Sequence, residues 1–283
     1  MQRPLDRTLV VDFSRYLPGA LAGAELRRLG ARVVRVERPG GDPMRTTAPA
    51  WYEQLNAGKE AADWSLAPEL LGTADVVLES FRPGAAERLG IGPEAAPDTV
   101  VYCSITGFGT GGRHELRAGH DLNYLGWAGV LESTAPALPP VQVADLAAGA
   151  LGAVVEILAA LLERARTGRG SRIVVSMTHN AHKLACRAPV LTAGFACYRM
   201  YATSDGRFVT VGALEPKFFA RLCDLLGRPE LAERQYADDQ QALGAELESL
   251  FRARTLAEWL TLFDGEDVCV GPVATLAEAD AEL

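Results

Sequence analysis

The sequence has few residues of the types that form metal and disulfide sites, with five cysteines and four histidines among 283 residues. The cysteines form no C-x-x-C pair, and none has a histidine nearby at metal-ligand spacing. We therefore expect no metal site and five reduced thiols. In the apolar run VVYCSITGFG, Cys103 is expected to be a small buried residue of a strand. The five cysteines are Cys103, Cys186, Cys197, Cys223 and Cys269.

Positive charge and long apolar runs are also scarce. The net charge is −8 and the acidic residues are spread along the chain, so the surface is expected to repel nucleic acid and anionic membranes. The first residues, MQRPLDRTLVVDFSRY, lack a signal-peptide core, and no stretch approaches about 18 uninterrupted apolar residues. We therefore expect a cytoplasmic protein with neither a nucleic-acid nor a membrane partner.

Short β-branched runs alternate with helical periodicity along the first part of the chain. The strand-like runs are residues 9–14, 31–37, 74–80 and 99–109. This alternation predicts an α/β fold with a Rossmann-like, doubly wound parallel sheet. A long apolar helix from Val143 to Arg166 and a further strand, IVVSM, extend the pattern. The first turn, SRYLPGALAG, lacks the G-x-G-x-x-G spacing, which argues against a nicotinamide site of the Rossmann type.

The pattern changes after about residue 195. YRMYATSDGRFVTVGA predicts two alternating strands joined by a Ser-Asp-Gly turn. One helix is expected to begin at Pro216, and another is expected around TLAEWLTLF. We therefore predict a large Rossmann-like domain over residues 1–194 and a smaller α+β domain over residues 195–283.

A glycine-rich loop follows the fourth strand-like run and leads to a histidine. The glycines of residues 107–112, GFGTGG, permit close approach of a ligand at the carboxyl end of a strand, and His120 follows. An imidazole exchanges protons near neutral pH, so His120 is a candidate acid or base. From the residues alone, the favoured alternative is a helix cap by Asp121 or Asn123, with His120 packed beside it.

Three further residues suit chemistry but also have ordinary structural roles. Asp145 lies at the entrance of an apolar helix, where burial raises and the helix dipole lowers the pKa of a carboxyl group. Glu215 precedes the helix expected at Pro216. From the residues alone, a helix cap is the favoured interpretation of both acids. Arg38 ends the second strand, where a guanidinium meets either a nucleotide or only solvent.

Six stretches of the sequence carry a resemblance to a known family. They are LVVDFSRYLPGALAGAELRRLGARVVRVERPGGDP, DVVLESFRPGAAERLGIGPE, VVYCSITGFGTGG, AGHDLNYLGWAGVL, VADLAAGALGAVVEILAALLERARTGRGSRIVVSM and YATSDGRFVTVGALEPKFFARLC. In this order, and over most of the chain, they resemble the class III coenzyme A transferases, and most closely the α-methylacyl-CoA racemase branch. The resemblance implies that residues 1–194 bind coenzyme A.

The resemblance also implies roles for particular positions. Arg38 corresponds to an arginine that stacks on the adenine of coenzyme A, and Asp145 corresponds to the common catalytic carboxylate. LNAGKEAADWSL is similar to a segment whose extended residues line the nucleotide. The expected nucleotide-lining residues are Asp63, Trp64, Ser65 and Leu66, and those of the thioester side are Gly119, Asp121, Leu122, Asn123 and Tyr124.

Two segments, G-H-D-x-N-Y and G-A-x-E-P, favour the racemase branch. The resemblance implies that His120 and Asp145 serve opposite faces of the carbon α to a thioester, with Glu215 supporting His120. Backbone N–H groups at the start of the helix after Asp145 are expected to stabilise the enolate oxygen. Because the thioester supplies the acidity, coenzyme A is expected as part of the substrate, without a metal or redox cofactor. Two alternatives stay open: a CoA transferase in which Asp145 forms an acyl-aspartyl anhydride, and a noncatalytic family member.

The sequence departs from the family pattern in ways that bear on its partners. Ala57 and Glu60 stand where arginine is common, so fewer charge-assisted contacts to a polyphosphate are expected. The expected partner is therefore an acyl-CoA or a carrier-bound acyl thioester, and a smaller acid is a further alternative. The segments on which the family's interlocked dimer depends are short here. An open sheet edge nevertheless favours association, and we expect a homodimer.

Overall fold

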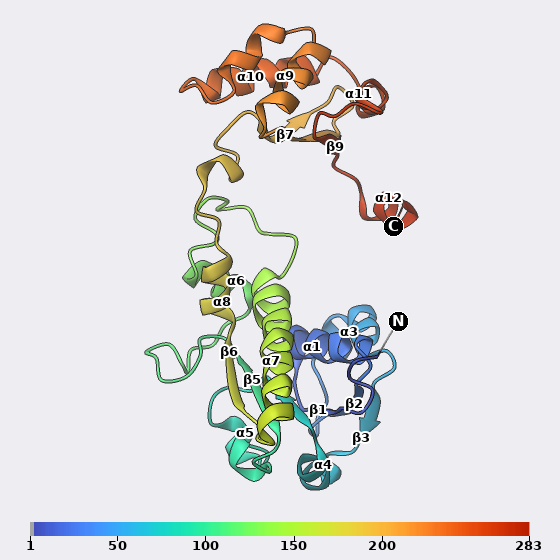
Figure 1. Ribbon diagram of the computed structural model, residues 1–283, viewed down its shortest axis with the longest axis vertical. Helices are drawn as coiled ribbons and strands as arrows, with labels where there is room; N and C mark the ends of the chain where they lie inside the picture. Colours follow the sequence, from blue (N-terminus) through green and yellow to red (C-terminus); the bar gives the residue numbers. More distant parts are fainter. Residues whose placement is uncertain (1–2, 283) are drawn as a thin grey trace. The chain divides into compact units, whose positions relative to one another are not determined.

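The computed structural model describes residues 3–282, and their contacts divide into two compact units (Figure 1). The first unit ends at Ala185 and the second begins at Cys186. Contacts thus divide the chain somewhat earlier than the boundary after residue 194 that the sequence predicts.

The first unit is built on a six-stranded parallel sheet with the order β3-β2-β1-β4-β5-β6. The order reverses between β1 and β4, so the predicted Rossmann-like, doubly wound α/β fold is confirmed. The strands are β1 (Leu9–Asp12), β2 (Arg32–Val36), β3 (Glu60–Ala62), β4 (Val76–Glu79), β5 (Val101–Thr106) and β6 (Arg172–Ser176).

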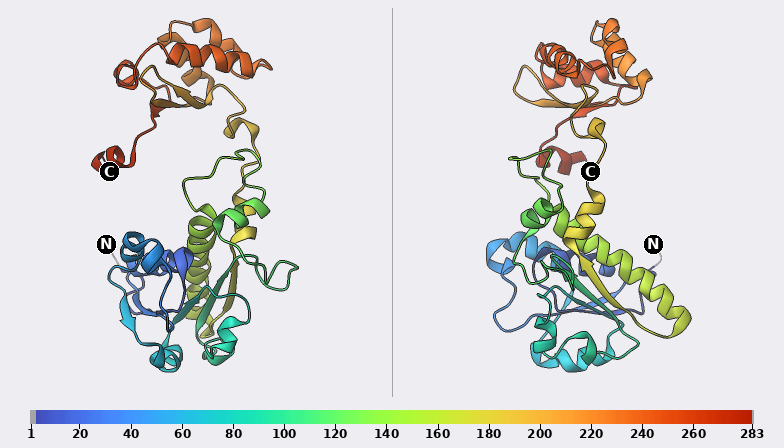
Figure 2. Two further views of the ribbon diagram at one scale, coloured as in Figure 1. Left: turned by 180° about the vertical axis from the view of Figure 1, so that it is seen from behind. Right: turned by 90° about the vertical axis from the view of Figure 1, so that its left-hand side faces the viewer.

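Helices cover both faces of this sheet. Helices α1 and α7 pack on one face, and α4 and α5 lie on the other (Figure 2). Side-chain alternation along each strand explains this division, because Val10 faces α1 and α7 whereas its neighbour Val11 faces the opposite side. The bounds of these helices are α1 (Tyr16–Arg28), α4 (Ala67–Thr73), α5 (Ala85–Arg88) and α7 (Gly152–Thr167).

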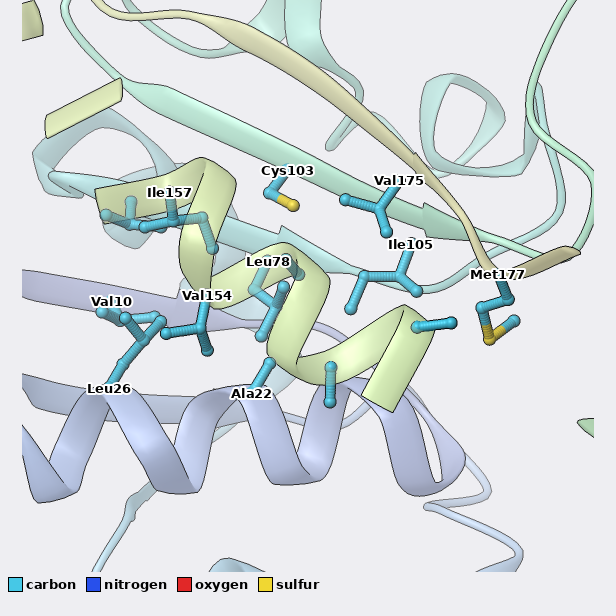
Figure 3. Close-up of a cluster of buried hydrophobic side chains, with 14 of the residues drawn as sticks. Val10, Ala22, Leu26, Leu78, Cys103, Ile105, Val154, Ile157, Val175 and Met177 are labelled. Carbon is cyan, nitrogen blue, oxygen red and sulfur yellow. The ribbon is translucent and has the colours of Figure 1, made fainter. Parts of the chain in front are cut away.

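A buried apolar cluster joins the sheet to α1 and α7 (Figure 3). Leu78 and Ile105 project from the strands toward Val154 and Ile157 of α7. Cys103 belongs to the same cluster and is 0% exposed, which confirms its prediction as a buried strand residue. Burial of such side chains is the main stabilising contribution to this unit.

The long helix predicted from Val143 to Arg166 runs from Ala144 to Thr167 in two parts. Ala144–Leu151 is π-helical, and α7 continues it as an ordinary α-helix. Short π-helical segments within helices are frequent at functional sites. By length and composition Ala144–Thr167 could also cross a membrane, a property that buried core helices share.

Several short elements near the carboxyl end of the strands are not predicted from the sequence. Strand β3 contains no β-branched residue, and α3 and α8 are each only eight residues long. The remaining elements of this unit are α2 (Met44–Thr47), α3 (Pro49–Asn56), α6 (Asp121–Trp127), α8 (Met177–Leu184) and the 3-10 turns η1 (Trp64–Leu66) and η2 (Pro93–Ala95).

The second unit is a smaller α+β fold, as predicted. Its antiparallel sheet has the order β7-β8-β9, and the β7–β8 hairpin turns at Gly206, whose φ is 75°. Aromatic side chains, including Tyr201, Phe251 and Trp259, form its core. Its elements are the 3-10 turns η4 (Pro189–Leu191) and η5 (Pro229–Arg234), the strands β7 (Tyr198–Ala202), β8 (Phe208–Gly212) and β9 (Val270–Pro272), and the helices α9 (Pro216–Leu225), α10 (Gln240–Phe251), α11 (Leu256–Phe263) and α12 (Leu276–Glu282).

Candidate active site

A cavity of about 330 Å³ lies at the carboxyl end of the parallel strands, where the strand order reverses. Open α/β sheets hold ligands in this crevice. His120 and Asp145 both line the cavity, so the structure brings these two predicted residues together. Other lining side chains come from residues that follow β1, β4 and β6, among them Arg15, Tyr16, Arg82 and Met177.

His120 occupies the N-cap position of α6, but its imidazole does not form the cap. The side-chain oxygen of Asn123 accepts the backbone N–H of His120 at 3.1 Å. The ring of Tyr16 meets the imidazole edge to face, with centroids 5.8 Å apart. The capping role foreseen for Asn123 is therefore confirmed, and His120 lines the cavity.

Asp145 is the second residue of the π-helical segment, and only 8% of it is exposed. Its carboxyl group has neither a hydrogen bond nor an ion pair with any residue in the described range 3–282. Burial raises the pKa of Asp145 to about 7, and the nearby Asp121 carboxylate acts in the same direction. A carboxyl group with this pKa is present in both protonation states near neutral pH.

Asp121 caps the helix that contains Asp145. Its Oδ1 accepts the Asp145 backbone N–H at 2.9 Å, and burial raises the pKa of Asp121. The next N–H, that of Leu146, donates to the carbonyl of Gln142 at 2.8 Å. The two N–H groups at this helix start are therefore already engaged, and the expectation that they stabilise an enolate oxygen is not met.

Tyr124 explains two glycines of the loop before α6. A Cβ at Gly107 would lie 2.5 Å from the Tyr124 ring, and one at Gly119 would lie 2.8 Å from it. The Tyr124 hydroxyl donates to the Gly119 carbonyl. These glycines therefore accommodate a tyrosine ring, and both also line the cavity. Close approach of a ligand to the glycine loop stays a prediction.

Tyr16 and Arg15 belong to the site but were not singled out from the sequence. Tyr16 adopts a φ of 64°, which is uncommon for a residue with a side chain, and its N–H donates to Asp42 Oδ2 at 3.0 Å. Arg15, Arg82 and Arg117 add three cationic side chains to the cavity. Arg15 and Arg82 each closely follow the end of a parallel strand. Because open α/β sheets bind ligands at this end of the strands, that position could have indicated from the sequence that both residues belong to the site.

The residues expected to bind the nucleotide lie elsewhere on the same edge of the sheet. Arg38 follows β2, and residues 63–66 follow β3. Asp63 caps the short turn η1 by accepting the Ser65 N–H at 2.9 Å, and Trp64 packs edge to face on Phe13. None of these residues lines a cavity that contains His120.

Glu215 belongs to the second unit. It stands at the N-cap of α9, where its carbonyl accepts the Phe218 N–H at 3.0 Å, and its side chain forms no cap. Its support of His120 stays a prediction from the resemblance. Among residues 3–282, the His, Cys, Asp and Glu side chains form no group of three or more that could hold a metal ion.

A second cavity, of about 390 Å³, also contains His120 and Asp145. Most of its other lining side chains are apolar, and they come from α1, α3, α6 and the loop before the π-helical segment. The apolar residues are Leu17, Trp51, Leu122, Leu138 and Pro139. The two candidate acid-base residues therefore stand where two cavities meet.

Known proteins are similar to this chain over nearly all of its length. The family model described as CoA-transferase family III matches residues 5–283. Human alpha-methylacyl-CoA racemase is 35% identical over 296 residues, which cover 95% of this chain and 77% of that protein. Human succinyl-CoA:glutarate CoA-transferase is 31% identical over 326 residues, which cover 99% of this chain and 74% of that protein.

Solved structures agree with the sequence comparison. The crystal structure of Rv3272 from M. tuberculosis is similar with a TM-score of 0.85 and 32% identity, covering 98% of this chain and 85% of that one. Related proteins are thus racemases and CoA-transferases, which act on CoA thioesters. The chain belongs to the class III CoA-transferase family.

Proposed function

We propose that the protein is a cofactor-free racemase or epimerase that inverts the carbon α to an acyl thioester, such as a 2-methylacyl-CoA. One observation carries the proposal. An imidazole, that of His120, and an unpaired carboxyl group, that of Asp145, line the same cavity, and the pKa of the carboxyl group is raised to about 7. Such a pair suits proton transfer in both directions at neutral pH.

The proposed reaction moves one proton off the α carbon and another onto it. A base on one face takes the α proton, and the electron pair of the broken C–H bond moves into the thioester carbonyl to give an enolate. An acid on the other face then returns a proton to the carbon. Inversion requires that one group is unprotonated while the other is protonated, and the raised pKa of Asp145 allows it to take either part.

The remaining assignments rest on the family resemblance and form part of the proposal. Arg38 and residues 63–66 would hold the nucleotide of coenzyme A, and Glu215 would support His120. The thioester makes the α proton acidic, so no redox or metal cofactor is needed for this step. We also retain the homodimer in the proposal, and sedimentation of the purified protein tests it.

Hydrogen exchange tests the proposed function directly. The wild-type protein is incubated in heavy water with (2R)- and (2S)-2-methylacyl-CoA, and deuterium at the α carbon is followed by mass spectrometry. Exchange from both enantiomers is expected, and His120→Ala should abolish inversion while the protein stays folded. Absence of exchange with every 2-methylacyl thioester tried would exclude the proposal.

CoA transfer is the second candidate, because a transferase is among the relatives and the Asp145 carboxyl group faces a cavity. A transferase would form an acyl-aspartyl anhydride at Asp145 as the thiolate of coenzyme A leaves. Hydroxylamine converts that anhydride to a hydroxamate, which peptide mass spectrometry detects. Proton transfer produces no such adduct. A noncatalytic family member would show neither exchange nor adduct.

A further inference from the structure

The turn that leads from β1 into α1 is held by side chains from three strand ends. The successive backbone N–H groups of residues 14–16 donate, in chain order, to Asp12 Oδ1 at 2.9 Å, Ser80 Oγ at 2.8 Å and Asp42 Oδ2 at 3.0 Å. Asp12 ends β1, whereas Ser80 and Asp42 follow β4 and β2. Each N–H group of the turn is thus fixed by a different part of the sheet edge.

Ser80 holds Arg15 by both of its backbone polar groups. The Ser80 hydroxyl accepts the Arg15 N–H at 2.8 Å and donates to the Arg15 carbonyl at 2.8 Å. A single hydroxyl can do both. The next N–H, that of Phe81, donates to the buried Glu79 carboxyl group at 2.6 Å, which fixes the loop that carries Ser80. The loops after β1 and β4 are therefore joined across the point where the strand order reverses.

Tyr16, the next residue of the turn, has a backbone conformation that a side chain disfavours. Its φ is 64°, and a residue with a side chain keeps such an angle only when the surrounding structure determines it. The Tyr16 ring contacts the His120 imidazole, with centroids 5.8 Å apart and planes at 81°. The guanidinium carbon of Arg15 lies 5.5 Å from the same ring centroid. The strained backbone therefore determines where the ring beside His120 lies.

We infer that Ser80 is a positioning residue for His120. Ser80 holds Arg15 on both sides and so keeps Tyr16 at a positive φ, and the Tyr16 ring fixes the orientation of the imidazole. Without the Ser80 hydroxyl, φ of Tyr16 can relax to negative values, which moves the ring away from His120. The consequence for proton transfer rests on the proposed function, because an acid or base must lie within reach of the proton that it moves.

Three substitutions test these contacts one at a time. Ser80→Ala removes both hydrogen bonds to Arg15, and Ser80→Thr keeps a hydroxyl that can restore them. Tyr16→Gly removes the ring but suits the positive φ. The matched control is Ser171→Ala, because Ser171 is also partly buried and precedes β6 at the opposite end of the sheet, outside both cavities that contain His120.

The first measurement is NMR of the imidazole groups, which needs no substrate. The chain has four histidines, so the His120 signals can be followed individually and assigned with His120→Gln. The His120 signals should shift in Ser80→Ala and in Tyr16→Gly, because the aromatic contact is lost, and Ser80→Thr should return them toward the wild type. The control should leave all four histidines unchanged. Unshifted His120 signals in Ser80→Ala would overturn the inference.

The second measurement is α-deuterium exchange with 2-methylbutanoyl-CoA. A misplaced imidazole in Ser80→Ala should lower kcat about tenfold or more and leave KM within about threefold. Ser80→Thr should recover most of kcat. Because Ser80 acts through the Tyr16 ring, the double variant should be little slower than Tyr16→Gly alone. Losses that multiply in the double variant, or a change confined to KM, would overturn the inference.

The two readouts separate this inference from the proposed function. If the His120 signals move in Ser80→Ala but the wild type exchanges no deuterium, the positioning role stands and the racemase proposal fails. If the wild type exchanges deuterium but the signals do not move, the racemase proposal stands and the positioning role fails. If Ser80→Ala does not fold, Ser80→Cys replaces it under the same criteria, because a thiol is a weak hydrogen-bonding group.

Discussion

Two groups of buried or partly buried acidic side chains in the first unit differ in how their charge is balanced. Asp12 lies 3.2 Å from Arg35 and 3.2 Å from Lys59, and Arg35 lies 2.6 Å from Asp42. These four side chains, the paired cluster, are at most 4% exposed. Burial acts to raise the pKa of Asp12, but the charges of Lys59 and Arg35, together with hydrogen bonds from Ser14, outweigh it, and the pKa is lowered.

The second group, Asp121 and Asp145, has no cationic partner among residues 3–282. Burial therefore raises the pKa of both carboxyl groups, and for Asp145 the value is about 7. Buried acids that are paired act as structural elements, whereas an unpaired acid with a shifted pKa, facing a cavity, is available for proton transfer. The comparison predicts that substitutions in the paired cluster mainly change stability, whereas substitutions of Asp121 and Asp145 mainly change activity.

The largest expected effect is on activity at Asp145. Asp145→Asn keeps the size of the side chain but removes the acid-base group, so α-deuterium exchange should fall about a thousandfold. Circular dichroism should be unchanged. Asp98→Asn, at an exposed acid outside both cavities, is the control and should retain wild-type exchange. A loss below about tenfold at Asp145 would remove this residue from the mechanism.

A large loss of stability is expected in the paired cluster. Lys59 donates to Asp12 and also to the Ala20 carbonyl at 2.8 Å, so Lys59→Met leaves the Asp12 charge buried with one cation fewer. Removing one partner of a buried ion pair costs about 3–5 kcal/mol, which urea denaturation measures. Lys59→Met combined with Asp12→Asn should recover part of the loss. A single variant as stable as the wild type would show that this pairing is dispensable.

The pH dependence of stability should have opposite signs in the two groups. The pKa of Asp145 is about 7 in the folded protein, against an ordinary value of 3.8. The contribution of Asp145 to the stability of the folded state therefore becomes less favourable as the pH rises from 3.8 to about 7. Asp145→Asn should therefore melt several °C above the wild type at about pH 8 and match it at about pH 4. The lowered pKa of Asp12 has the opposite effect, because its carboxylate stabilises the folded state at higher pH. Asp12→Asn should therefore be less stable than the wild type above about pH 4.

Differential scanning calorimetry across this pH interval checks both variants against the wild type. Curves that diverge in opposite directions as the pH rises would support the comparison. Curves of the same sign would show that charge balance does not distinguish the two groups.

The main strands of the fold could be predicted because β-branched runs alternate with helical periodicity. Strand β3, with the sequence Glu-Ala-Ala, could not, because its residues favour helix and only pairing with β2 makes it a strand. Lys59 is similar. A lysine is normally exposed, and its burial depends on Asp12, which is distant in sequence.

The candidate site shows the same limit. From the residues alone, His120 and Asp145 were no better than helix caps, and the family resemblance raised them above that. The structure shows that the Asn123 and Asp121 side chains cap these helix starts, and that His120 and Asp145 line one cavity. Tyr16 could not have been found, because its positive φ and its contact with His120 depend on tertiary structure.

The smallest expected effect concerns Asp121, whose charge is the second cause, after burial, of the raised pKa of Asp145. Asp121→Asn removes the charge, while its amide oxygen can still accept the Asp145 N–H. We expect the acidic limb of kcat/KM, measured in the direction in which Asp145 takes the proton, to move to lower pH by less than about one unit.

Asp121→Ala also removes the acceptor, so it should cost about 1 kcal/mol of stability in addition. An unshifted limb in Asp121→Asn, together with a lower melting temperature in Asp121→Ala, would mean that Asp121 acts only as a helix cap. In that case burial alone would set the protonation of Asp145.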